Sequence, residues 1–127
     1  MPFDATDFVD QQTLNDLHLI QKARHRIRVP QLWCRDRLVS GNRLCMLGAI
    51  AYASGASLEE IRRVNDGAVM SKQVEDHYDH IISIIERYIP GYVLPDYNDD
   101  CLVAHTDILA LFDRVIADYR HRVGLEV

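Results

Sequence analysis

The stretch Leu44–Gly55, Leu-Cys-Met-Leu-Gly-Ala-Ile-Ala-Tyr-Ala-Ser-Gly, decides the fold of this 127-residue chain. It contains no charged residue, and apolar or small side chains fall on all sides when it is wound as a helix. A helix that is apolar all round belongs inside a core rather than on a surface. Gly55 suits the left-handed position that commonly ends a helix. We therefore predict a central buried helix over 44–54, with the rest of the chain packed around it.

The segments on either side show the helical spacing of apolar residues, and strand-like alternation is almost absent. Capping patterns predict helix starts at Thr13, Ser57 and Ser71, and a last helix starts at Thr106 or Asp107. The sequence thus predicts an all-α, compact single-domain bundle of about five helices. Residues 1–12 are read as an acidic N-terminal arm, and 13–127 as a single helical domain.

Two connections interrupt the helical pattern. Residues 31–43 contain the turn signal Ser40-Gly41-Asn42 and are predicted to form a loop with one helical turn or a short extended piece. Tyr92–Cys101 is rich in turn-forming residues, and we predict an extended connection there.

Composition indicates an ordinary globular protein, with 48% hydrophobic and 26% charged residues. The central uncharged run is too short to span a bilayer, and the acidic N-terminus lacks the positive region of a secretory signal. Three cysteines without regular spacing do not indicate a disulfide framework. We therefore expect a cytoplasmic protein that does not enter a membrane.

Positive charge is concentrated in one part of the chain. Seven basic residues and one acidic residue give positions 22–43 a charge of +6, so the remainder carries −11. Such a stripe could meet nucleic acid, an acidic partner or an acidic loop of the same chain. Because no recognised nucleic-acid-reading motif accompanies the charge, we do not expect nucleic acid to be the partner.

Two motifs resemble a known family. The first is Trp33 followed by 42–50, which holds the pattern Cys-x-x-Gly-Ala, and the second is Tyr97-Asn98-Asp99-Asp100 followed by a helix that contains Leu-Phe-Asp-Arg-Val-Ile. This arrangement resembles a family of small bacterial and phage proteins classed as a domain of unknown function, over roughly 14–119. Val115 stands where that family usually has alanine, and Cys34 and Cys101 lie outside its pattern. The resemblance implies a fold but no activity.

Cys45 is the candidate nucleophile, because the N-terminus of a helix lowers the pKa of a thiol. His105 with Asn98 or Asp99 could complete a catalytic set if folding brings these residues together. The alternative is that Cys45 packs as a small hydrophobe, as free cysteines often do. We favour packing, and on that basis Cys45→Ser should be more harmful than Cys45→Ala.

Metal sites are conceivable but less well supported. Cys101 and His105 have zinc-like spacing that Cys34 and Cys45 could complete, yet structural zinc sites usually show two close ligand pairs. Residues 98–100 could hold a hard cation with Asp96, but the pattern of a calcium loop is missing. We predict no metal and no cofactor.

The Asn98-Asp99 turn is predicted to be a structural latch whose side chains bond backbone groups and set the entry of the last helix. Trp33 is predicted to be a lid on the core, and Thr106 to cap the last helix. The leading functional hypothesis is a non-enzymatic helical accessory or interaction module that binds a protein partner or itself. The alternative is a small cysteine-dependent hydrolase or transferase that uses Cys45 and His105.

Overall fold

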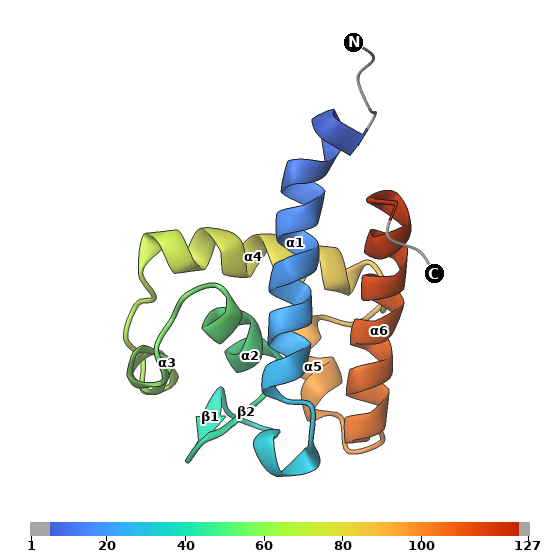
Figure 1. Cartoon of the computed structure of the whole chain (residues 1–127). Helices are drawn as coiled ribbons and strands as arrows, with labels where there is room; N and C mark the ends of the chain where they lie inside the picture. Colours follow the sequence, from blue (N-terminus) through green and yellow to red (C-terminus); the bar gives the residue numbers. More distant parts are fainter. Residues whose placement is uncertain (1–5, 125–127) are drawn as a thin grey trace.

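Helix α2 (Met46–Ala53) lies at the centre of the computed structural model, which describes residues 6–124, with side chains from residue 11 onward. Helices α1 (Thr6–Arg26) and α6 (His105–Arg122) run side by side, and α4 (Lys72–Glu86) crosses behind α1 in the view of Figure 1. The shorter helices α3 (Leu58–Asn65) and α5 (Leu94–Asp99) flank α2. The predicted all-α fold is confirmed, with six α-helices in the described residues.

The connection after α1 contains a 3-10 turn, η1 (Pro30–Leu32), and a short antiparallel hairpin of β1 (Val39–Ser40) and β2 (Arg43–Leu44). Gly41 stands at the tip of the hairpin with a φ of 64°, a value that glycine adopts without steric cost. The prediction of a loop with one helical turn or a short extended piece is confirmed, since both are present.

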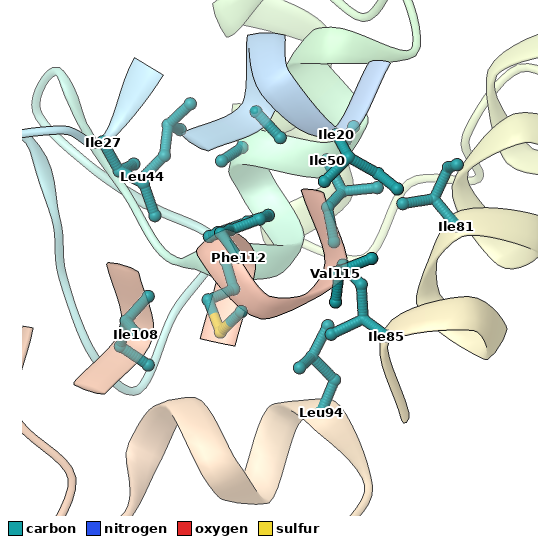
Figure 2. Packing of buried hydrophobic residues seen from close by; sticks show 14 of the residues in the cluster. Ile20, Ile27, Leu44, Ile50, Ile81, Ile85, Leu94, Ile108, Phe112 and Val115 are labelled. Atoms are coloured by element: carbon teal, nitrogen blue, oxygen red, sulfur yellow. The ribbon is translucent and has the colours of Figure 1, made fainter. Parts of the chain in front are cut away.

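The core forms around α2, as its uncharged sequence predicts. Met46, Ala49, Ile50 and Ala51 are fully buried. Figure 2 shows Ile50 among apolar side chains from the neighbouring helices, Ile20 of α1, Ile81 and Ile85 of α4, and Val115 of α6. Because every long helix contributes to this one cluster, the helices share a single core.

Gly48 lets the hairpin backbone approach α2. A Cβ atom placed on Gly48 would lie 2.3 Å from the carbonyl oxygen of Leu38, which is closer than real Cβ contacts. The same carbonyl accepts a hydrogen bond from the backbone N–H of Cys45 at 3.1 Å. The hairpin is therefore fastened against the first turn of α2.

Two predicted helix boundaries around α3 are confirmed. The Ser57 hydroxyl accepts a hydrogen bond from the Glu60 N–H at 3.1 Å and caps α3. Gly55 follows α2 with a φ of 112°, the left-handed conformation expected of it.

Other boundaries differ from the sequence-based expectation. Helix α1 begins at Thr6, so Thr13 lies within it rather than at its start; residues 1–5 of the expected arm lie outside the described residues. No glycine or proline occurs between Thr6 and Val29 to end the helix sooner. Ser71 is the N-cap residue of α4, where the sequence predicts the start of this helix, but its hydroxyl makes no cap; its N–H instead donates to the Glu60 carboxylate at 3.0 Å.

The predicted extended connection 92–101 is wrong over residues 94–99, which form helix α5. Pro95 lies in the first turn of α5, where its fixed φ favours a helix and its missing N–H is no loss. The Glu86 carboxylate accepts a hydrogen bond from the Leu94 N–H at 2.6 Å. Glu86 is the last residue of α4, eight residues before Leu94, so part of this start signal comes from the preceding helix.

Within the described residues, no helix is both long enough and apolar enough to cross a membrane.

Candidate functional site

Asn98 is the centre of the most connected polar cluster in the described chain. It lies in α5 and is fully buried. Its Oδ1 accepts hydrogen bonds from the Trp33 indole N–H at 2.9 Å and from the Met46 backbone N–H at 3.0 Å. Its Nδ2 donates to the Cys34 carbonyl at 3.2 Å and to the Asp99 carboxylate at 2.9 Å. All four hydrogen-bonding positions of the amide are therefore used.

Asp99 extends this cluster to a strained turn. Its Oδ1 accepts a hydrogen bond from the backbone N–H of Asp36 at 2.8 Å. Asp36 has a φ of 69°, a left-handed conformation that is uncommon outside glycine and that aspartate tolerates better than most residues. Asn98 and Asp99 thus hold the segment 33–36 against α5 and against the start of α2.

Trp33 and His105 close the cluster on the side of α6. Trp33 is 8% exposed, and the centre of its ring lies 5.6 Å from the centre of the His105 ring. The Arg35 guanidinium lies 4.6 Å from the centre of the Trp33 ring and donates to the Val103 carbonyl. His105 Nε2 pairs with the Ile27 carbonyl oxygen at 2.7 Å. His105 therefore connects the start of α6 to the end of α1.

Helix α6 begins at His105, before both of the predicted starts, Thr106 and Asp107. Ala104 is its N-cap, and the Asp107 carboxylate accepts a hydrogen bond from the Ala104 N–H at 2.8 Å. Thr106 lies in the first turn of the helix and is exposed. Asp107 supplies the side-chain contact at this end of the helix that the sequence analysis expected from Thr106.

Cys45 is the N-cap of α2. Its Sγ accepts a hydrogen bond from the Gly48 N–H at 3.3 Å, and the residue is 3% exposed. A helix N-terminus favours a thiolate, but burial disfavours charge more strongly at this position. Burial raises the pKa of the Cys45 thiol to about 12. The thiol is therefore protonated at neutral pH.

Cys45 and His105 line two hollows that share no residue. Cys45 borders a hollow of about 240 Å³ with Asp36, Asn65 and Asp99. His105 borders one of about 460 Å³ that includes Trp33. Asp99 thus lines the same hollow as Cys45. His105 does not, and its Nε2 instead faces the backbone carbonyl of Ile27.

The remaining two cysteines differ in burial. Cys34 Sγ lies 3.5 Å from the Arg37 carbonyl oxygen, burial raises the pKa of its thiol, and Cys101 is exposed. In the described part of the chain, no three His, Cys, Asp or Glu side chains are grouped as metal ligands would be.

The basic residues of 22–43 do not form one face. Arg24 pairs with Asp113 of α6 at 2.6 Å, and Arg35 covers Trp33. Lys22 and Arg26 lie over the ring of Tyr52 in α2, at 5.7 Å and 5.4 Å from its centre. This pairing with Tyr52 was not predicted from the sequence, although the spacing of Lys22 and Arg26 by four residues places them on one face of α1.

Comparison with known proteins gives a family but no activity. Residues 11–118 match the model of a family of unknown function, DUF6197. No curated protein and no solved structure matches the chain.

Proposed function

Because the chain belongs to DUF6197, a family of unknown function, we propose a role from its site alone: a small non-enzymatic helical module that acts by binding a partner. The observation that carries this proposal is the state of Cys45. Its sulfur caps α2, it is 3% exposed, and burial holds its pKa near 12. A nucleophilic cysteine needs a thiolate and access to substrate. The Cys45 thiol is protonated at neutral pH and almost fully buried, so it meets neither requirement.

The other residues of the cysteine-enzyme alternative are also occupied. The Asn98 amide makes all four of its hydrogen bonds to groups of the same chain, and His105 Nε2 pairs with the Ile27 carbonyl. A general base must reach the proton that it abstracts, and Cys45 and His105 border different hollows. These contacts support a structural role for the set, and they favour binding over catalysis.

We further propose that the module works in the reducing cytoplasm of a bacterium or its phage. The three free cysteines of the chain support a reducing compartment, since one of them, Cys101, is exposed and would pair or oxidise readily elsewhere. The partner that we propose is a protein, either a second copy of the chain or a different protein of the same cell.

Alkylation of the native protein tests the chemistry. Iodoacetamide at neutral pH should label the exposed Cys101 and leave the buried Cys45 unlabelled, as read by peptide mass spectrometry. Cys101 serves as the internal control for reagent activity. Rapid labelling of Cys45 that slows in His105→Gln would favour the enzyme instead. An esterase or acyl-transfer activity that disappears in Cys45→Ala would overturn the proposal.

Sedimentation equilibrium of the purified chain tests self-association, and affinity capture from the native host followed by reconstitution with the purified candidate tests a different partner. The proposal requires a complex of fixed stoichiometry in one of these experiments. A chain that stays monomeric and reconstitutes no such complex would contradict it.

A further inference from the structure

A basic hollow lies at the C-terminal end of α1, away from the Asn98 cluster. Its volume is about 520 Å³, within the usual range for small-molecule sites, and α1, η1, the hairpin turn, α2 and α3 all contribute to it. Figure 1 shows the lower end of α1 approaching η1 and the hairpin, the elements that supply several of the lining residues. Four basic side chains line it: Lys22, His25, Arg26 and Arg28.

No carboxylate is among the described residues that line this hollow. Within residues 11–124, no ion pair involves Lys22, Arg26 or Arg28, whereas the neighbouring Arg24 is paired with Asp113. Like charges held close together repel one another, and an anion between them relieves that repulsion. The concentration of positive charge is notable because the whole chain carries a net charge of −5.

The guanidinium groups are held in place with donors to spare. Arg26 donates one hydrogen bond to the Asn42 carbonyl at 2.6 Å and lies over the Tyr52 ring. Arg28 donates one to the His25 carbonyl at 3.0 Å. Each guanidinium has five N–H groups in a planar fork that matches the oxygen atoms of a phosphate. Arg62 extends the basic rim, because it donates to the Gly41 carbonyl beside Asn42 at 3.2 Å.

The same hollow has apolar walls. Leu32 of η1, Tyr52 of α2 and Leu58 of α3 line it, and all three are half-buried. Inorganic phosphate would use the basic groups alone, whereas a ligand with a planar or apolar group would also cover these side chains. A ligand with two or more negative charges fits three permanent cations better than a single carboxylate does.

We propose that this hollow binds a small organic phosphate, such as a nucleoside mono- or diphosphate, with the phosphate on Lys22, Arg26 and Arg28 and the organic part against Leu32 and Leu58. The inference does not depend on the proposed lack of catalysis at Cys45. It assigns a ligand class to a surface that shares no residue with the Asn98 cluster.

Isothermal titration calorimetry of the full chain with ADP, AMP, pyrophosphate and adenosine tests the site. We expect ADP to bind, pyrophosphate to bind more weakly, and adenosine to give no heat. Raised sodium chloride should weaken ADP binding, because salt screens the charges. Absence of ADP and AMP binding at millimolar concentration would overturn the proposal, and so would pyrophosphate binding as tightly as ADP, which would reduce the site to an inorganic-anion site.

A matched pair of double variants separates the hollow from general charge. Lys22→Gln with Arg28→Gln should weaken ADP binding by about tenfold or more. Lys72→Gln with Arg87→Gln removes the same charges at the two ends of α4, which do not line the hollow, and should leave binding unchanged. An equal loss of ADP affinity in the two double variants would overturn the proposal.

Should the first double variant fail to fold by circular dichroism, Arg28→Gln alone should still weaken ADP binding about threefold, since its one described side-chain bond is to the adjacent turn. Unchanged ADP affinity in that single variant would contradict the proposal. A single-stranded oligonucleotide that binds in proportion to its length, and equally to both double variants, would reassign the charge to a nucleic-acid surface and also overturn it.

Discussion

At the scale of single residues, Asn98 offers the sharpest test of the fold. Asn98→Ala leaves the Trp33 indole N–H and the Met46 N–H buried without their acceptor. Stranded buried donors cost about 1–3 kcal/mol each, so the free energy of unfolding in urea should fall by about 3 kcal/mol. Asn15→Ala is the control, because Asn15 is exposed on α1 and should change stability by less than about 0.5 kcal/mol. Equal stability of the two variants would refute the latch.

Cys45 gives a second test, and here the structure reverses an expectation drawn from the sequence. Serine was expected to be worse than alanine because a hydroxyl needs a partner, but the Gly48 N–H supplies one. Serine is a strong N-cap and alanine is not. Cys45→Ala should therefore lower the thermal unfolding temperature more than Cys45→Ser, with a cost of about 1–2 kcal/mol for the alanine variant. The opposite order would mean that sulfur packing outweighs the cap.

The Cys45 thiol also predicts a dependence of stability on pH. Burial raises its pKa from 9.0 to about 12 in the folded protein, so the unfolded chain loses this proton first as pH rises. The associated stability is complete below about pH 9 and is lost progressively toward pH 12. Urea unfolding at pH 8, 9 and 10 should show a steeper loss for the wild type than for Cys45→Ala. Burial also raises the pKa of Tyr88 to about 12. Because Tyr88 is present in both proteins, its contribution cancels when their stabilities are compared.

At the scale of elements, the contact between α2 and the hairpin depends on Gly48. Alanine is the better helix former by about 1 kcal/mol, so Gly48→Ala would stabilise an isolated helix. In this fold the new Cβ would lie 2.3 Å from the Leu38 carbonyl oxygen, which is backbone and cannot rotate aside. We expect a net loss of about 2 kcal/mol in chemical denaturation, the range of an overpacked core. The exposed Gln73→Ala of α4 is the control and should be nearly neutral.

The elements also show what the sequence can and cannot predict. The central helix, the Ser57 cap and the Gly55 turn follow from local spacing, and all three are present. The helix spans Met46–Ala53 rather than the predicted 44–54, because Leu44 pairs in β2 and Cys45 is the N-cap. Helix α5 could not be predicted in the same way, because part of its start signal is the Glu86 carboxylate from α4. The Asn98-Asp99 turn was identified as a backbone-bonding feature, but its partners Trp33, Met46 and Asp36 are far away in sequence. Local patterns carry no information about which distant groups will meet.

At the scale of the whole molecule, one hydrophobic cluster includes residues of every α-helix from α1 to α6. No part of it is separated as a second core, so the helices should unfold together. Far-ultraviolet circular dichroism and tryptophan fluorescence should give coincident urea transitions. Two separated transitions would show that the hairpin and η1, next to Trp33, unfold independently of the helices.

The distance along the chain between the partners of Asn98 has a consequence for kinetics. Its bonds to Trp33, Met46 and Cys34 close loops of 65, 52 and 64 residues, whose ends meet only when most of the chain is already arranged. We therefore expect these bonds to be absent from the folding transition state, with φ-values near zero. In stopped-flow experiments that follow the sole tryptophan, Asn98→Ala should unfold about a hundredfold faster and fold at nearly the wild-type rate. A single buried amide would thus determine how long the native state lasts rather than how quickly it forms.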